Sequence, residues 1–247
     1  MDLGLTDRVY LVTGAADGVG RACAEQLAAE GARMVLGGDD DEAALAGVAA
    51  VLGGSDRAMA ISGDLAEAGI ETCLVAAAIA RYGRLDGALV TVVPPPPGAA
   101  VDTGDGDWRL AFESSFLGPL RLCRAVARNA SQEGGSIVLL LPASGRAAAG
   151  ACGLDEGLRP AVAGTSRALA EELGHRAIRV NTVLSGLVDG DLTADDDDLG
   201  ALVVAGSALG RCGEPSEIAR PAVFLLSPAA SYVTGTTLAV DGGAARA

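Results

Sequence analysis

The sequence predicts an α/β fold in which a doubly wound parallel sheet of about seven strands carries helices on both faces. Short apolar runs alternate with longer, Ala-rich helical patterns along most of the chain. The apolar runs are nearly continuous, which is typical of strands buried on both faces of a parallel sheet. The chain has 247 residues, near the upper limit for one domain, and contains no linker or repeat. We therefore expect residues 1–247 to form a single domain.

Each element follows from its local pattern. Strands are expected at residues 9–13, 33–36, 58–61, 85–93, 136–141, 178–183 and 237–240. Helices are expected after the first glycine turn through about residue 30, and at residues 42–52, 66–82, 107–129, 164–173 and 217–226. Two stretches, 94–107 and 186–206, read as irregular, and the acidic run at 195–198 reads as a solvated loop.

Charge and cysteine usage exclude several classes of function. The formal net charge is −14, and both nucleic acid and an anionic membrane surface require a basic face instead. The five cysteines are scattered and there is one histidine, so we expect no metal site and a reducing, cytoplasmic location. No apolar run reaches the roughly 18 residues of a membrane span, and no basic segment precedes a signal core.

A glycine turn separates the first expected strand from the first expected helix. Its glycines, Gly14, Gly18 and Gly20, allow a tight turn and a close approach of the backbone to a pyrophosphate, which the helix N-terminus would bind. The alternative is a turn kept only for packing. Asp39 follows the second strand, where an NADP enzyme would carry arginine, so a bound dinucleotide should be NAD.

The pattern Thr-Gly-x-x-x-Gly-x-Gly at residues 13–20 resembles the cofactor turn of the short-chain dehydrogenase/reductase family. Further similar motifs are Gly-Asp-Leu at 63–65, Ile-Arg-Val-Asn at 178–181, and the segments 213–219 and 232–243. The resemblance spans nearly the whole chain and implies a Rossmann-type fold. The cofactor contacts that it implies are Gly14, Asp17, Gly18, Val19, Gly20, Asp39, Asp64 and Leu65.

In that family a tyrosine acts as acid and base, a lysine four residues later lowers its pKa, and a serine and an asparagine complete the site. These four positions fall here on Asp155, Arg159, Pro142 and Ser115, so none keeps the family's residue. Proline offers neither a hydroxyl nor an N–H to a substrate oxygen.

Asp155 and Arg159 are spaced to form an ion pair across one helical turn. Arg159 would favour the ionised carboxylate, which has no proton to donate. The alternative is a new chemical role for Asp155, Arg159 or Ser144. Pro160 predicts that this helix begins only near residue 160, and His175 reads as a surface residue.

The expected nicotinamide side departs further from the family. Thr-Val-Val-Pro at 91–94 replaces Asn-Asn-Ala-Gly, and three more prolines follow without N–H donors. Ser185 replaces a proline, and Gly190 replaces the threonine that would hold the carboxamide. We therefore expect weak or absent dinucleotide binding, better for NAD than for NADP.

The four replacements predict a non-catalytic structural or regulatory subunit. It would form a homo- or hetero-oligomer, preferably with an intact relative, as in an alcohol or hydroxyacyl-CoA dehydrogenase complex. The helix faces at 120–127 and 162–173 would provide the contact, with Arg121, Arg124 and Arg128 opposite Glu171 and Glu172. The alternatives are an enzyme with rebuilt chemistry and an NAD-dependent oxidoreductase that uses substitute residues.

Overall fold

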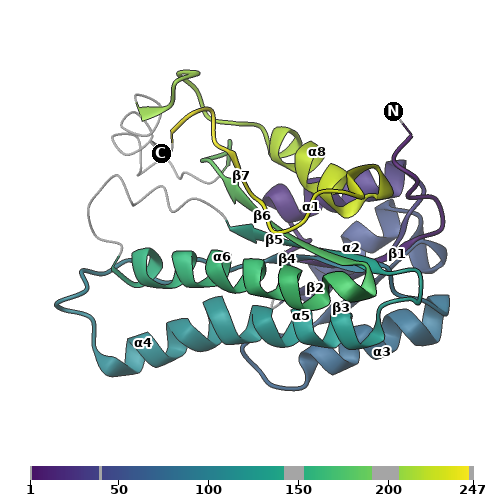
Figure 1. Ribbon diagram of the computed structural model, residues 1–247, viewed down its shortest axis with the longest axis horizontal. Helices are drawn as coiled ribbons and strands as arrows, with labels where there is room; N and C mark the ends of the chain where they lie inside the picture. Colours follow the sequence, from purple (N-terminus) through teal and green to yellow (C-terminus); the bar gives the residue numbers. More distant parts are fainter. Residues whose placement is uncertain (1, 39–40, 142–152, 191–205, 245–247) are drawn as a thin grey trace.

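A computed structural model describes residues 2–38, 41–141, 153–190 and 206–244 (Figure 1). Seven parallel strands form one sheet in the order β3-β2-β1-β4-β5-β6-β7. The strands are β1 (Val9–Thr13), β2 (Arg33–Gly38), β3 (Ala58–Ser62), β4 (Gly87–Thr91), β5 (Gly135–Leu141), β6 (Ile178–Ser185) and β7 (Thr237–Val240). The predicted doubly wound parallel sheet is confirmed.

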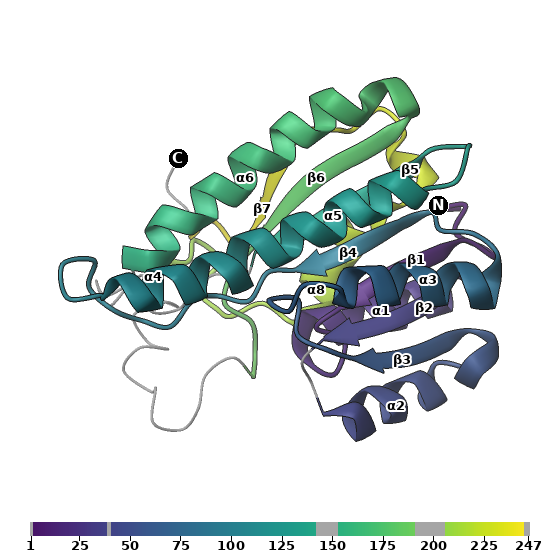
Figure 2. The same cartoon turned by 90° about the horizontal axis from the view of Figure 1, so that it is seen from below.

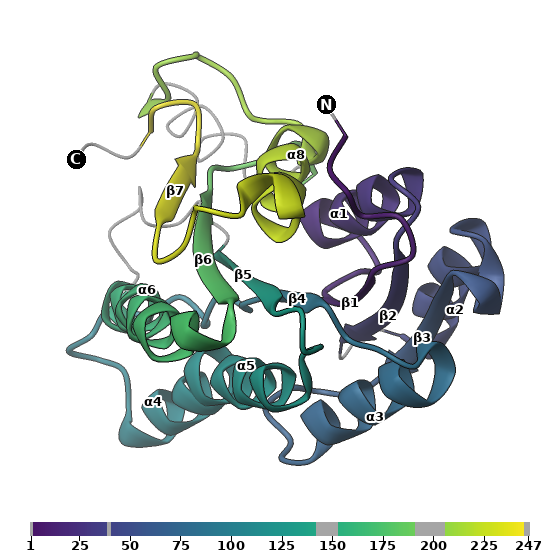
Figure 3. The same ribbon diagram turned by 45° about the vertical axis from the view of Figure 1, so that its right-hand side comes forward.

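Helices cover both faces of the sheet (Figures 2 and 3). One face carries α1 (Gly18–Ala29), α2 (Glu42–Val51) and α8 (Pro215–Leu226). The other carries α3 (Ile70–Tyr82), α5 (Gly118–Asn129) and α6 (Gly153–Leu173), with α4 (Asp105–Phe112) leading into α5. Short turns of 3-10 helix lie at Gly54–Asp56, Gly174–Arg176 and Pro228–Ala230.

Neighbouring residues along a strand pack into the hydrophobic cores on opposite faces of the sheet. In β1, Tyr10 and Val12 pack with the α1, α2 and α8 side, whereas Val9 and Leu11 pack with the α3, α5 and α6 side. All five residues of β1 are buried. This explains why the strands read as continuous apolar runs rather than as an alternation of apolar and polar residues.

The strand order reverses at β1, which pairs with β2 on one side and β4 on the other. In open α/β sheets such a switch point opens a crevice at the carboxyl ends of the strands, where ligands bind. The carboxyl ends of β1 and β4 meet here: the Thr91 amide donates to Thr13 Oγ1 at 2.8 Å, and Thr91 Oγ1 donates to Thr13 O at 2.9 Å.

Three of the predicted helices, those expected at 66–82, 107–129 and 164–173, differ from the structure. The helix expected from residue 66 begins at Ile70, because Asp64 Oδ1 accepts the Ala66 amide at 2.7 Å and turns the chain before the helix. The helix expected over 107–129 begins at Asp105 and is interrupted by a π-helical turn, η2 (Glu113–Leu117), between α4 and α5.

The expectation that α6 starts near Pro160 is wrong, since the helix already includes Gly153. Leu154 and Leu158 are buried against Ala111 and Trp108 of α4, and this packing holds the early turns in place. Pro160 removes one helical N–H donor but leaves that buried contact intact. Tertiary packing thus outweighs the local proline signal.

In the part of the chain that the structure describes, no helix is both long and apolar enough to cross a membrane.

Candidate active site

Residues 14–20 (the glycine turn), which join β1 to α1 and include the first residues of α1, lie at the crevice. Gly14 has a φ of 63°, and a side chain at Gly20 would clash with the Gly14 carbonyl oxygen. Asp17 is the N-cap residue of α1, yet its side chain makes no capping hydrogen bond. The first N–H groups of α1 are therefore not capped by Asp17, and this end of the helix suits an anion such as a pyrophosphate.

The loop after β3 lies along the same edge of the sheet. Asp64 is exposed and Leu65 is half-buried, and the Gly63 amide donates to Gly38 O at the end of β2 at 2.6 Å. Asp39 lies outside the described residues. Together the glycine turn, including exposed Asp17 and half-buried Val19, and the loop at Asp64 fit the adenine and pyrophosphate part of a dinucleotide.

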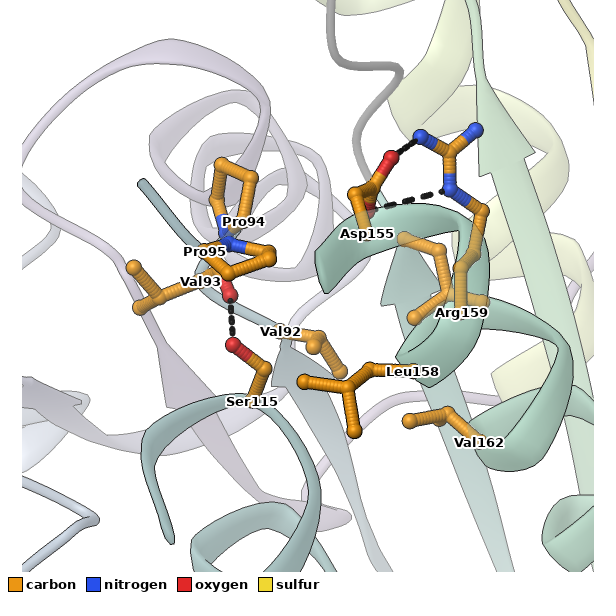
Figure 4. Close-up of a pocket in the computed structure, with 10 residues that line it drawn as sticks. Val92, Val93, Pro94, Pro95, Ser115, Asp155, Leu158, Arg159 and Val162 are labelled. Carbon is orange, nitrogen blue, oxygen red and sulfur yellow. Dashed lines mark hydrogen bonds and ion pairs between the residues drawn. The ribbon is translucent and has the colours of Figure 1, made fainter. Parts of the chain in front are cut away.

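A second hollow lies beside the carboxyl ends of β4 and β5 (Figure 4). We call it the Asp155 pocket. Its walls are largely apolar and come from β4 and its following loop, β5, η2 and α6. The lining residues are Val92, Val93, Pro94, Pro95, Ser115, Leu141, Asp155, Leu158, Arg159 and Val162.

Asp155 and Arg159 form the charged part of this pocket. Arg159 Nε donates to Asp155 Oδ1 at 3.3 Å, and Arg159 Nη2 donates to Asp155 Oδ2, so the guanidinium grips the carboxylate with two bonds (Figure 4). The Asp155 side chain is 9% exposed and that of Arg159 is 24% exposed. The predicted ion pair across one turn of α6 is confirmed, and it fixes an ionised carboxylate against an apolar wall.

Ser115 stands in the π-helical turn and is buried. Its Oγ donates to Val93 O at 2.8 Å (Figure 4). The hydroxyl therefore ties η2 to the loop that follows β4. π-helical turns occur frequently at functional sites, and this one lines the Asp155 pocket.

The tyrosine and lysine of the family's chemistry have no substitute elsewhere in this chain. All 18 basic residues are arginine. Tyr10 lies in the core, where burial raises its pKa and its hydroxyl contacts Leu226 O at 3.3 Å. Tyr82 ends α3 and contacts Met34 O at 3.4 Å, while Tyr232 is fully exposed after α8.

Several predicted positions can be placed only in part. Pro142, Ser144 and the acidic run 195–198 lie outside the described residues. His175 is exposed in the 3-10 turn that follows α6, as expected. Among the described residues, no group of three His, Cys, Asp or Glu side chains could hold a metal ion.

The sequence alone gave no sign of two contacts that shape the site. The two hydrogen bonds between Thr13 and Thr91 join β1 to β4, although the two threonines are 78 residues apart in sequence. Arg121 donates to the carbonyl oxygen of Ala66, 55 residues away. Both pairs of residues are too far apart in sequence for a local pattern to predict their contact. Only the packing of the fold brings these groups together.

Comparison with known proteins agrees with this geometry. The family described as enoyl-(acyl carrier protein) reductase matches residues 14–245. The chain is 37% identical to galactitol 2-dehydrogenase of Cereibacter sphaeroides, covering 94% of this chain and 92% of the relative. It is 35% identical to 2,5-dichloro-2,5-cyclohexadiene-1,4-diol dehydrogenase of Sphingobium indicum, covering 97% of each chain. It is 32% identical to 3-oxoacyl-(acyl-carrier-protein) reductase of Escherichia coli, covering 96% of each chain.

Among solved structures, a short-chain dehydrogenase/reductase of Brucella melitensis superposes with a TM-score of 0.87 at 32% identity, over the full length of both chains. This chain belongs to the short-chain dehydrogenase/reductase family. The prediction of a non-catalytic subunit is wrong, because the chain matches named dehydrogenases and reductases over almost its whole length.

Proposed function

We propose that this short-chain dehydrogenase/reductase is an NAD-dependent dehydrogenase that oxidises a small secondary alcohol. The observation that carries the proposal is the buried Asp155 carboxylate, gripped by Arg159 and facing an apolar pocket. In this proposal Asp155 takes the place of the family's tyrosine and Arg159 that of its lysine.

The residues that would hold the dinucleotide lie along the carboxyl ends of β1 and β3. The N-terminus of α1 with Gly18, Val19 and Gly20 would bind the pyrophosphate, and the loop at Asp64 and Leu65 would bind the adenine. NAD is favoured over NADP because Asp39 and Asp40 follow β2 in the sequence and would repel a 2′-phosphate. When bound, the nicotinamide ring accepts the hydride.

The proton balance of the reaction favours oxidation. The substrate C–H bond gives up a hydride, the O–H bond gives up its proton to the Asp155 carboxylate, and a carbonyl product is formed. Arg159 stays charged throughout and keeps the carboxylate in one orientation. An ionised carboxylate can accept a proton and has none to give, so oxidation is expected to outrun carbonyl reduction at neutral pH.

The substrate class draws on two relatives. Galactitol 2-dehydrogenase and the cyclohexadiene-diol dehydrogenase are both named for substrates with secondary hydroxyls. The apolar walls contributed by Val92, Leu158 and Val162 favour an uncharged substrate over a charged one.

The test is NAD reduction with galactitol and with cyclohexane-1,2-diol, using the full chain and its Asp155→Asn variant. Asn keeps the shape but cannot accept the proton, so kcat should fall by about 10²–10³-fold. Glu156→Gln, an exposed neighbour on the same helix, is the matched control and should keep full activity. Equal rates for the wild-type chain and Asp155→Asn, or no oxidation by the wild-type chain, would contradict the proposal.

We also propose that the chain works as an oligomer. A groove between α5 and α6 is lined by apolar residues, including Phe116, Leu120 and Leu169. Exposed arginines Arg124 and Arg128 on α5, and exposed Glu171 and Glu172 on α6, would supply a complementary rim. Light scattering that shows only a 24.4 kDa monomer, with or without a related subunit, would exclude this assembly.

A further inference from the structure

Arg121 of α5 joins two segments that belong to different parts of the proposed site. Its Nη1 donates to Ala66 O at 3.2 Å, and its Nη2 donates to Glu113 Oε2 at 2.7 Å. Its side chain is only 19% exposed, while that of Glu113 is 43% exposed. A pair confined to the protein surface would contribute little. The added bond to a backbone carbonyl sets Arg121 apart from such a pair.

The first of these segments is the loop after β3. Asp64 Oδ1 accepts the Ala66 amide at 2.7 Å, and the Glu67 amide donates to Asp64 O at 3.0 Å. The loop packs closely against the start of α5, where a side chain at Gly118 would clash with the Leu65 carbonyl oxygen. By holding Ala66 O, Arg121 fixes the backbone that sets the direction of Asp64 and Leu65.

The second segment is the π-helical turn η2. Glu113 is its first residue, and Ser115, two residues later, donates to Val93 O in the wall of the Asp155 pocket. The Arg121 guanidinium therefore connects the loop at Asp64 to η2, the same turn whose Ser115 hydroxyl donates to Val93 O. An arginine can make both contacts at once because its N–H groups diverge in one plane, whereas a lysine ammonium is a point donor.

We propose that Arg121 is a positioning residue that holds the adenine loop and the wall of the Asp155 pocket in one fixed arrangement. The part that concerns the adenine rests on the dinucleotide binding proposed above. The mechanical part, that Arg121 orders the loop at Ala66, holds for the protein without any ligand.

Three variants of the full chain separate these parts. Arg121→Met keeps most of the aliphatic stem and loses both bonds. Arg121→Lys keeps the charge but can reach only one partner. Arg109→Met removes an exposed arginine of the neighbouring helix α4, outside the proposed site and the proposed subunit contact, and is the matched control.

Two measurements are made on each variant. Amide hydrogen exchange of Ala66 and Glu67, followed by NMR without ligand, should speed up by about tenfold in Arg121→Met and stay unchanged in Arg109→Met. The affinity for ADP-ribose, measured by calorimetry, should fall by about five- to tenfold in Arg121→Met and by less in Arg121→Lys. The melting temperature of Arg121→Met should fall by no more than about 2–4 °C. The variant then remains folded, and a lower affinity for ADP-ribose cannot be attributed to unfolding.

The outcomes distinguish the two proposals. Unchanged exchange at Ala66 in Arg121→Met would overturn the positioning role, whether or not the chain oxidises an alcohol. Faster exchange with undiminished ADP-ribose affinity would also overturn it, because the loop would then be ordered without serving the ligand. Failure of the wild-type chain to bind ADP-ribose would overturn the dinucleotide proposal and the adenine part of this one together.

Discussion

The glycine turn and the Asp155 pocket lie at the same edge of the sheet but are built in different ways. The glycine turn is made of backbone: its shape depends on the missing side chain at Gly20 and on the φ of Gly14. The Asp155 pocket is made of side chains: an ion pair, a serine hydroxyl and apolar walls. Backbone sterics tolerate almost no substitution, whereas a site built from side chains can exchange them while the fold stays the same. We therefore expect substitutions to be tolerated less well in the glycine turn than in the Asp155 pocket.

The largest effect is expected at the backbone-built region. Gly20→Ala places a Cβ against the Gly14 carbonyl oxygen, and since that atom belongs to the backbone, the turn itself must shift. We expect a loss of about 3 kcal/mol or more in the free energy of unfolding, together with loss of dinucleotide binding. Denaturant unfolding and calorimetry measure the two effects.

The matched control for this prediction is Gly47→Ala. Gly47 lies inside α2, and a Cβ there meets nothing within 4 Å. This variant should gain about 0.5–1 kcal/mol, because alanine favours the helix. If Gly20→Ala were as stable as Gly47→Ala, the glycine turn would not be determined by sterics, and the comparison would fail.

The next largest effect is expected when the ion pair is broken. Arg159→Met removes the guanidinium that pairs with the nearly buried Asp155 carboxylate, and the free energy of unfolding should fall by about 1–3 kcal/mol. The loss should be smaller than for a fully buried pair because the Arg159 side chain is 24% exposed. Loss of the guanidinium also leaves the carboxylate free to change its orientation, so the rate of alcohol oxidation should fall. Arg167→Met, at an exposed position of α6, should change neither property. An unchanged rate of oxidation in Arg159→Met would show that the pair does not control the reaction.

A smaller effect is expected at Ser115. Ser115→Ala leaves Val93 O without the hydroxyl that donates to it, at a cost of about 1–2 kcal/mol in the free energy of unfolding. Ser114→Ala removes a hydroxyl that bonds only to carbonyls of the preceding helical turn, and it should cost less. Thermal unfolding compares the two variants. Equal costs would mean that the tie between η2 and Val93 contributes nothing specific to the pocket.

The smallest effect is expected at Glu217, in α8, which packs against α1 behind the glycine turn. The Arg211 guanidinium, followed by the Glu214 amide, lowers the pKa of Glu217 from 4.5 to about 2. A carboxyl whose pKa is lowered by folding stabilises the native state above its unfolded pKa. The difference in melting temperature between wild type and Glu217→Gln should therefore be fully present near pH 7 and fade as the pH falls from about 4.5 to 2. A difference that persists at pH 2 would show that it does not come from this charge.

The sequence by itself determined the sheet, most of its strands and the glycine turn. These are local properties: apolar runs of strand length, Ala-rich helical periods, and glycines at fixed spacing after the first strand. It also determined the ion pair between Asp155 and Arg159, because four residues span one helical turn. The function predicted from the four replaced positions was wrong, because a list of missing residues says nothing about what the remaining side chains do together.

Only the tertiary structure decided where α6 begins, that η2 interrupts the helix between residues 105 and 129, and that Arg121 reaches Ala66. Leu154 and Leu158 extend α6 past Pro160 because they bury their side chains against α4, and no local pattern records that contact. Ala66 and Arg121 are 55 residues apart, and their hydrogen bond exists only because β3 ends and α5 begins at the same edge of the sheet. Local periodicity fixes which elements form, whereas the packing of distant segments fixes which side chains meet, and the chemistry of this site depends on the second.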